Sequence, residues 1–296
     1  MFCRKTLVFT SAVSLLVLGS LRAAEAPNQP WQNVPASEPL ATKQVRGNLY
    51  QVSGGVANTF FYVGPDEVLV VDAKMTPDAA RQMLAEVKKV TDKPVRRVIL
   101  THSDGDHVNG LAGLMPVPTI ISHANSRLHM AQANATASNK LPLPNETFSQ
   151  QLSLYLGDTE IRVLYFGPAH TNGDAVIFIP SEKLAIVGDL VFVGRDPLIH
   201  RQKGGSSVGL VALLKSLLQL DADLYLSGHA EAVDKQAIER LLTEIEQKQA
   251  KVKTLVAEGK TFSEVKEAFG LTDQPAGGRR WPSLVEVIYR ELTEKN

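Results

Sequence analysis

Short apolar runs separated by glycine- and proline-containing turns recur through most of the chain, a pattern typical of β-strands. Several runs are apolar at successive positions, which predicts strands that are buried on both faces of a sheet. The expected strands cover residues 49–53, 59–63, 68–72, 95–101, 117–122, 152–156, 161–166, 175–179, 184–187 and 224–227.

Segments with helical periodicity lie between and after these runs. Thr76 followed by Pro77 predicts an N-cap and the first residue of an amphipathic helix that ends near residue 90. Further helices are expected over residues 125–133, 208–220, 233–257, 261–269 and 282–294. Strands with interspersed helices predict a layered α/β protein whose sheets are covered by helices.

The first residues have the pattern of a secretory signal peptide. Arg4 and Lys5 precede an apolar run over residues 7–21, and Ala24-Glu25-Ala26 offers a small-x-small cleavage pattern. The run is shorter than the ~20 residues of a membrane span, so we expect cleavage after about residue 26, no stable anchor, and a periplasmic or secreted protein. The one cysteine, Cys3, would be removed, which leaves no disulfide and no thiolate ligand.

The remaining chain is long enough for one large domain with an appendage. Beyond the signal peptide over residues 1–26, we expect an extended leader over 27–46, a main domain over 47–235 and a C-terminal helical extension over 236–296 packed on the same domain. The chain has 31 basic and 31 acidic residues and no basic run, which argues against nucleic acid as a partner. A small-molecule substrate is expected, and the sequence does not determine the oligomeric state.

Residues 102–107 read His-Ser-Asp-Gly-Asp-His and directly follow an apolar run that ends at Thr101. This places four potential metal ligands in six residues at the end of a predicted strand. Carboxylates in one short loop repel each other, and their burial is costly unless a cation compensates. The cluster therefore predicts a metal site.

Three more polar residues follow predicted strands in the same way. His170, Asp189 and His229 each come after an apolar run and lie close to a glycine that lets the backbone turn around a ligand. Loops at the same end of a sheet converge, so these residues are expected to join the cluster. Imidazole and carboxylate without thiolate suit zinc, iron or manganese.

With Asp72, which ends the run Val-Val-Asp, the ordered set resembles the metallo-β-lactamase superfamily over about residues 45–235. The resemblance implies a four-layer αβ/βα sandwich with metals at one edge between the two sheets, and a C-terminal helical extension beyond it. It implies that Asp72 orders the ligand loop and that Asp189 bridges two ions. The other implied ligands are His102, Asp104 and His170 for the first ion, and Asp106, His107 and His229 for the second.

Asp104 departs from the family pattern His-x-His-x-Asp-His, which has histidine at this position. An additional carboxylate makes a two-metal site less positive, which should acidify bound water less and shift preference from zinc toward iron or manganese. We expect two divalent ions, zinc first, with iron or manganese as alternatives. The other possibility is that Asp104 does not ligate and that one site is weak or empty.

The expected function is that of an exported hydrolase in which a metal-bridging hydroxide attacks an ester, a lactone or a β-lactam-like substrate. Asp106, the expected catalytic residue, would accept a hydrogen bond from the attacking water. The cysteine-containing zinc β-lactamases match poorly, because Asp189 occupies their cysteine position. The alternatives are a non-haem diiron redox or oxygen-handling protein, since diiron relatives carry a carboxylate at position 104, and a catalytically silent metal-binding member.

The loop between Asp189 and His229 contains His200 and Lys203, which are candidates for contact with substrate. His200 could also protonate the leaving group, and Lys203 could bind a substrate carboxylate. The alternative for both is a solvated surface residue in a polar loop. Residues 277–282 could edge the cleft, or could pack as an appendage or oligomer contact.

Overall fold

The computed structural model describes residue 1 and residues 39–272 and 281–294. The chain divides into two units, Met1–Pro35 and Ala36–Asn296. The expected signal peptide after Met1, residues 27–38 of the expected leader and residues 277–280 lie outside the described residues. Within the described part of the chain, no helix is both long enough and apolar enough to cross a membrane.

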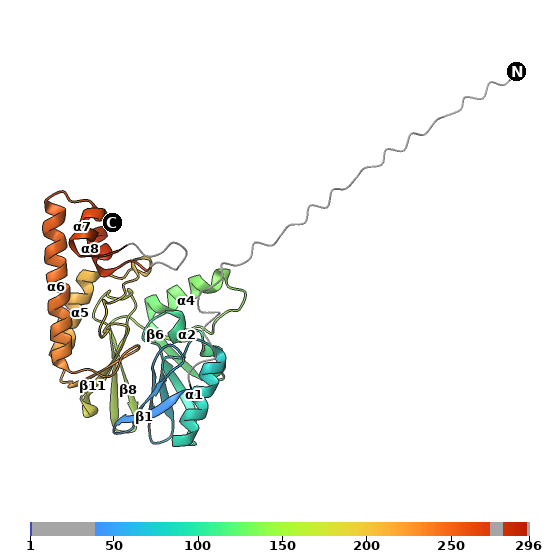
Figure 1. Ribbon diagram of the computed structural model, residues 1–296. Helices are drawn as coiled ribbons and strands as arrows, with labels where there is room; N and C mark the ends of the chain where they lie inside the picture. Colours follow the sequence, from blue (N-terminus) through green and yellow to red (C-terminus); the bar gives the residue numbers. More distant parts are fainter. Residues whose placement is uncertain (2–38, 273–280, 295–296) are drawn as a thin grey trace. The chain divides into compact units, whose positions relative to one another are not determined.

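Two sheets form the centre of the unit Ala36–Asn296 (Figure 1). The first sheet has seven strands in sequence order, namely β1 (Ala41–Arg46), β2 (Leu49–Ser53), β3 (Thr59–Val63), β4 (Val68–Val71), β5 (Val95–Ile99), β6 (Thr119–His123) and β7 (Glu146–Phe148). The second sheet has five strands in the order β12-β11-β10-β9-β8, namely β12 (Leu224–Ser227), β11 (Leu184–Gly188), β10 (Val176–Ile179), β9 (Thr159–Leu164) and β8 (Gln151–Leu156).

Helices cover the outer face of each sheet (Figure 1). The elements between β4 and β7 include α1 (Pro77–Val90), α2 (Gly105–Val108), α3 (Leu111–Leu114) and α4 (Ala124–Thr136). The later helices are α5 (Ser207–Gln219), α6 (Lys235–Ala257), α7 (Phe262–Ala268) and α8 (Leu284–Thr293), and two short 3-10 helices are η1 (Pro180–Glu182) and η2 (Arg201–Lys203). As predicted, the Thr76 side chain caps α1, where it accepts a hydrogen bond from the Ala79 amide.

Three buried apolar clusters separate these elements into four layers. Strand β4 shows the principle, because successive side chains of a strand point to opposite faces. Leu69 and Val71 pack between the sheets against residues such as Ile186, whereas Val68 and Val70 pack toward α1. A third cluster joins the outer face of the second sheet to α5, α6 and α8. The predicted four-layer αβ/βα class with C-terminal helices is confirmed.

Strand direction decides where the functional loops lie. Strands β4, β5 and β6 are parallel, so their carboxyl ends lie at the same edge of the first sheet. In the second sheet β11 is parallel to β12, and two successive antiparallel pairings make β9 run in the same direction as β11. The residues that follow β9, β11 and β12 therefore share one edge as well.

Residues 41–46 were expected to belong to an extended leader, and the structure corrects this. They form β1, which pairs antiparallel with β2 at the edge of the first sheet. Most β1 side chains are exposed or half-buried, so the strand lacks the apolar alternation by which strands are recognised. Residues 146–148, where no strand was expected, likewise form an edge strand, β7. Pairing with a neighbouring strand, not local pattern, defines these two elements.

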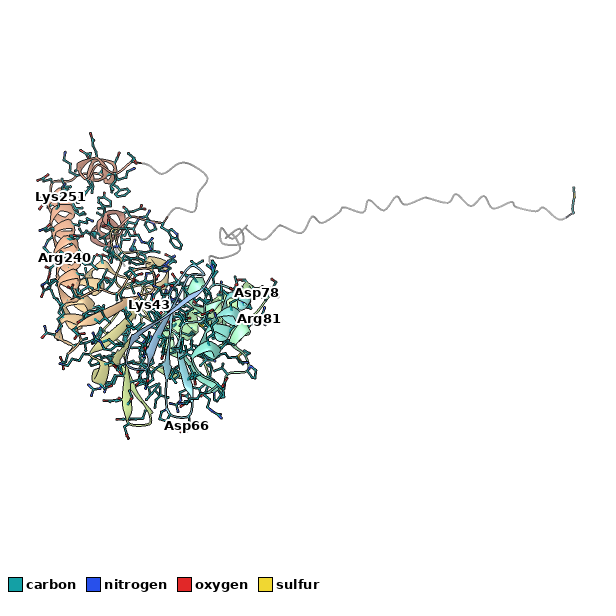
Figure 2. All side chains as sticks on the ribbon, turned by 60° about the horizontal axis from the view of Figure 1, so that its bottom comes forward. Lys43, Asp66, Asp78, Arg81, Arg240 and Lys251 are labelled. Atoms are coloured by element: carbon teal, nitrogen blue, oxygen red, sulfur yellow. The ribbon has the colours of Figure 1, made fainter. Side chains whose placement is uncertain are left out.

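Charged side chains lie mainly on the surface of the described unit. Figure 2 shows Arg81 and Lys251 at the margins of the view and Asp66 at a turn between two strands, and the Lys43 side chain is 53% exposed. Exposed ion pairs such as that between Lys43 and Glu231 contribute little to stability, because solvent screens them. The buried apolar clusters therefore carry most of the stability of this unit.

The packing of α8 generates a stability prediction. Ile288 is 3% exposed within the third cluster, whereas Leu292 on the same helix is 44% exposed. We expect Ile288→Ala to lower the free energy of unfolding by about 2–4 kcal/mol, because it leaves a cavity, and Leu292→Ala to lower it by less than about 0.5 kcal/mol. Urea unfolding followed by circular dichroism measures both, and equal effects would contradict the packing described here.

Candidate metal centre

The loops that follow four strands bring all seven predicted ligands together. The cluster 102–107 follows β5, with Asp106 and His107 on the short helix α2. The remaining ligands, His170, Asp189 and His229, follow β9, β11 and β12. Their side-chain donor atoms form three overlapping groups, each of which has the size of a metal site.

The first group consists of His102, Asp104 and His170. The Oδ2 atom of Asp104 lies 3.2 Å from His170 Nε2 and 3.8 Å from His102 Nε2. Both histidines are buried, and the Asp104 side chain is 14% exposed. This is the set that the resemblance implies for the first ion.

The second group consists of Asp106, His107 and His229. The Oδ2 atom of Asp106 lies 3.0 Å from His229 Nε2 and 3.6 Å from His107 Nε2. His107 is fully buried, whereas Asp106 and His229 each keep 17% of their side-chain surface exposed. The second group is thus the more accessible one.

Asp189 lies between the two groups. Its Oδ1 atom is 3.2 Å from His107 Nε2, and its Oδ2 atom is 3.2 Å from His229 Nε2 and 3.9 Å from His102 Nε2. One carboxylate therefore faces imidazoles of both groups, which is the position of a bridging ligand.

Asp72 orients His107 and fixes Thr101, the residue directly before the ligand cluster. Its Oδ2 atom lies 2.7 Å from His107 Nδ1, and its two oxygens accept hydrogen bonds from the amide and the hydroxyl of Thr101 at 2.8 Å each. A carboxylate that accepts from Nδ1–H directs the lone pair of Nε2 toward a metal. Asp72 has a φ of +66°, a strained conformation for a residue other than glycine.

Two partners of the ligand loops were missed by the sequence reasoning. The Nδ1 atom of His170 lies 2.7 Å from the carbonyl of Leu198, which fixes the orientation of the ring. The buried carboxylate of Asp174 accepts hydrogen bonds from the amide and hydroxyl of Thr171 and so shapes the loop that carries His170. The signal for Asp174 was present, since a carboxylate three residues after a threonine in a glycine-containing loop is typical of a side-chain turn.

Lys74 and Asn58 fix backbone segments next to the site through hydrogen bonds. The sequence reasoning missed both of them. The buried Lys74 ammonium donates to the carbonyls of Val52, Gly54 and Ala57 at 2.7–2.8 Å. The backbone amide of Asn58 donates a hydrogen bond to the carbonyl of Gly228, the residue directly before His229. These contacts fix the turn after β2 against the loop that carries a ligand.

The electrostatics of the cluster are those of a site built for cations. Burial lowers the pKa of His107, but the surrounding carboxylates, above all Asp189 and Asp72, outweigh burial and hold that pKa well above its usual range. At His170 and His229 burial also lowers the pKa, but neighbouring carboxylates outweigh it and raise the pKa to about 9. Without metal, the carboxylates therefore favour protonation of His107, His170 and His229.

Unpaired buried atoms show that the residues fit metal ions. Among the described residues, His102 Nε2, His107 Nε2 and Asp189 Oδ1 are buried and have no hydrogen-bond partner. Leaving such atoms unpaired is costly, so a ligand is expected to satisfy them. Nitrogen and oxygen donors of this kind suit zinc, iron and manganese. The residues of this cluster therefore fit divalent metal ions.

His200 and Lys203 both turn toward Asp104. His200 Nε2 lies 2.8 Å from Asp104 Oδ2, and Lys203 Nζ lies 2.7 Å from Asp104 Oδ1. The alternative of a solvated surface histidine is wrong, because His200 is 2% exposed and its ring packs edge-on against Trp281. The Lys203 side chain is 26% exposed and ion-paired, so it is not a freely solvated cation either. Their contact with a substrate remains a prediction.

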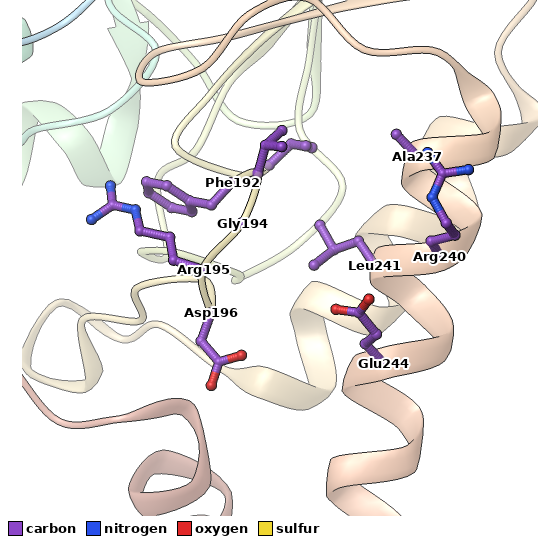
Figure 3. A pocket seen from close by; sticks show the side chains of 10 residues that line it. Phe192, Gly194, Arg195, Asp196, Ala237, Arg240, Leu241 and Glu244 are labelled. Carbon is purple, nitrogen blue, oxygen red and sulfur yellow. The ribbon is translucent and has the colours of Figure 1, made fainter. Parts of the chain in front are cut away.

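A pocket of about 320 Å³ lies between residues 191–196 and α6 (Figure 3). Its lining includes Arg195, Arg240 and Glu244 but none of the seven predicted ligands. Phe192, which also lines it, has a ring nearly parallel to that of His229 at a centroid distance of 6.0 Å. The pocket is therefore a neighbour of the metal centre and not its cleft.

The model of the family described as "Metallo-beta-lactamase superfamily" matches residues 52–229, more than half of the chain. The chain belongs to the metallo-β-lactamase superfamily. Relatives with curated descriptions share low sequence identity with this superfamily member. The 2,4-dinitroanisole O-demethylase subunit alpha of Nocardioides sp. (strain JS1661) is 28% identical over 192 residues, which cover 64% of this chain and 57% of that protein.

Two further relatives differ in how much of their length is matched. The linear primary-alkylsulfatase of Pseudomonas sp. (strain ATCC 19151) is 21% identical over 60% of this chain and 42% of its own length. The probable metallo-hydrolase YqgX of Bacillus subtilis (strain 168) is 26% identical over 60% of this chain and 87% of its own length. The chain thus spans about half the length of the first two relatives.

Solved structures support the superfamily fold. A metallo-β-lactamase from Pontibacter korlensis has a TM-score of 0.61 at 15% identity and covers 70% of this chain and 99% of its own. The sec-alkylsulfatase Pisa1 from Pseudomonas sp. has a TM-score of 0.70 at 14% identity and covers 86% of this chain and 50% of its own. At these identities the likeness shows the fold alone.

Gly228 generates a prediction about metal binding. A Cβ atom at this position would lie 2.5 Å from Asp189 Oδ1 and 2.8 Å from His107 Cε1. We expect Gly228→Ala to weaken divalent-ion binding at least about tenfold, because it displaces the bridging carboxylate. Chelator competition measures the affinity. Gly194→Ala is the control: a Cβ there meets nothing within 4 Å, but its φ of +73° strains the backbone, so this variant reports backbone strain without a clash on a ligand. Equal losses in the two variants would contradict the prediction.

The raised histidine pKa values predict a pH-dependent stability of the metal-free protein. For His170 and His229 the folded pKa of about 9 lies above the unfolded value of about 6.5, so the folded state binds more protons between these values. The stabilisation is complete below about pH 6.5 and is lost as the pH rises through 9. We expect the melting temperature of EDTA-treated protein to fall by several degrees from pH 6.5 to 9.5, and His170→Gln to reduce this slope. A flat profile would contradict the prediction.

Proposed function

We propose that this protein is an exported, metal-dependent hydrolase that acts on an ester, a lactone or a lactam. The proposal rests on one observation: two groups of candidate ligands lie together at the edge of the sheets, and Asp189 faces histidines of both groups. Membership of the metallo-β-lactamase superfamily supports the reaction class. Export rests on the basic and apolar pattern of residues 1–26.

His102, Asp104 and His170 would hold one ion, and Asp106, His107 and His229 the other, with Asp189 between them. Divalent ions bound there would lower the pKa of a water molecule and polarise the oxygen of the scissile group. Zinc is the first candidate for both positions, with iron or manganese as alternatives.

Asp106 is positioned to orient the attacking water. Its Oδ2 atom faces His229 and His107, whereas no hydrogen bond among the described residues engages Oδ1. That oxygen is able to accept a hydrogen bond from water and to take up its proton. Burial raises the pKa of Asp106, but the imidazoles of His107 and His229 outweigh burial and keep that pKa below its usual value, so the carboxylate is ionised at neutral pH.

The relatives define the substrate panel. Besides esters, lactones and lactams, sulfate esters belong to it, because two similar proteins are described as alkylsulfatases. The donor set contains no thiolate, which separates this centre from cysteine-containing zinc sites.

A diiron redox protein is the second candidate, and the carboxylate of Asp104 in the first group favours it. Metal identity separates the two functions. Purified protein that contains iron, shows reversible near-ultraviolet absorbance changes and turns over no member of the substrate panel would replace the hydrolase proposal with the redox one. Zinc with turnover supports the hydrolase.

Replacement of Asp106 tests the proposed mechanism. We expect Asp106→Ala to lower kcat by about 10³-fold with an unchanged circular dichroism spectrum, because the group that orients and deprotonates water is lost. Asp66→Ala, at an exposed turn, is the matched control and is expected to retain full activity. Metal content of each variant is measured alongside, and undiminished hydrolysis by Asp106→Ala would refute the role of this residue.

A further inference from the structure

Both oxygens of Asp104 are engaged by other side chains. Lys203 Nζ donates to Asp104 Oδ1 at 2.7 Å, whereas Oδ2 faces His170 at 3.2 Å and His200 at 2.8 Å. Lys203 lies 99 positions away in sequence, on the loop between Asp189 and His229. The residue that departs from the superfamily pattern is thus directly ion-paired with a cation from a distant loop.

The three donors of the Lys203 ammonium are all taken by acceptors of the protein. The ammonium donates to the carbonyl and to the hydroxyl of Ser103 at 3.1 Å each, in addition to Asp104 Oδ1. An ammonium group has three donors, and these three acceptors use all of them. The side chain is 26% exposed, so water screens the pair less than it screens a surface ion pair.

The backbone around Lys203 is equally fixed. Its amide donates to the carbonyl of His200, and its own carbonyl accepts from the amide of Asn172, next to the ligand-bearing loop of His170. Gly204 ends the 3-10 helix η2 with a φ of +70°, a conformation that favours glycine. The position of the ammonium is therefore set by the fold and not by a flexible loop tip.

We propose that Lys203 is a positioning residue that cancels the charge of Asp104 toward the first metal ion. An aspartate–lysine pair has no net charge, as a neutral histidine has none. The centre then keeps the net charge that it would have with histidine at position 104 and no lysine beside it, although one ligand is an anion. With Oδ1 held by Lys203, Oδ2 is the oxygen that would face a bound ion, beside His102 and His170.

This inference rests on the proposed two-metal function and changes one expectation drawn from it. An uncompensated Asp104 favours iron or manganese, because it makes the centre oxygen-rich and less positive. Compensation by Lys203 cancels the part of this metal preference that comes from charge. What remains is the replacement of a nitrogen ligand by an oxygen ligand. The centre is then electrostatically suited to zinc and to an acidified water.

Four proteins test the charge relation through metal affinity alone. They are the wild type, Lys203→Met, Asp104→His and the double variant, each stripped with chelator and titrated with Zn²⁺ and with Mn²⁺ against a chromophoric competitor. Lys203→Met lowers the charge near the first ion by one unit and Asp104→His raises it by one, whereas the double variant restores it. We expect the first change to strengthen binding about tenfold, the second to weaken it about tenfold, and the double variant to return to within about threefold of the wild type.

Two controls separate charge from structure. Lys203→Arg keeps the charge and is expected to bind metal within about threefold of the wild type. Lys215→Met removes a lysine from an exposed pair with Glu246 and is expected to change nothing. Melting temperatures of the stripped proteins identify any variant that fails to fold, and for such a variant Lys203→Gln replaces Lys203→Met.

The inference is overturned if Lys203→Met weakens metal binding or leaves it unchanged, or if the double variant stays as weak as Asp104→His. Either outcome would mean that Lys203 only supports the structure, or that its charge does not affect the affinity of the site for metal. A wild-type protein that binds no divalent ion overturns the proposed function and this inference together. Metal binding without turnover overturns only the proposed substrate class.

Discussion

Buried carboxylates face buried imidazoles at one edge of the two-sheet core, and the balance of their charges governs the rest of the site. Asp189 lies within 3.9 Å of three histidines, two of which, His102 and His107, are completely enclosed. Such a cluster is stable only if cations or protons occupy the space between the donors. The parallel strands place its members there, because their carboxyl ends share an edge.

Orientation of the ligands depends on groups that do not themselves face the metal positions. Asp72 accepts from Thr101 and faces His107 Nδ1, and the carbonyl of Leu198 does the same for His170. Each fixes one nitrogen of an imidazole so that the other is directed into the cluster. Asp72 has a positive φ of +66°, and its side chain is held by two hydrogen bonds from Thr101 and by the contact with His107 Nδ1.

The ion pair of Asp104 with Lys203 shows why a ligand motif is not a sufficient description of a metal site. Read along the sequence, the aspartate adds a negative charge and points to harder metals. In the folded protein the nearest cation is 2.7 Å away, and the charge at this position is balanced. His200, buried beside Oδ2 and against Trp281, closes the other side. Metal preference is a property of this whole environment.

The sequence by itself determined most secondary structure and the set of candidate ligands that the fold brings together. Period-2 and period-3.6 patterns, the Thr76-Pro77 cap and polar residues directly after apolar strands are local signals. What the tertiary structure decided has no local signal: the edge strand β1, the burial of His200, the role of Lys74, and the pairing of Lys203 with Asp104. These depend on which loops the two sheets bring together, because contact across 99 residues is created by strand order and direction and not by the residues between.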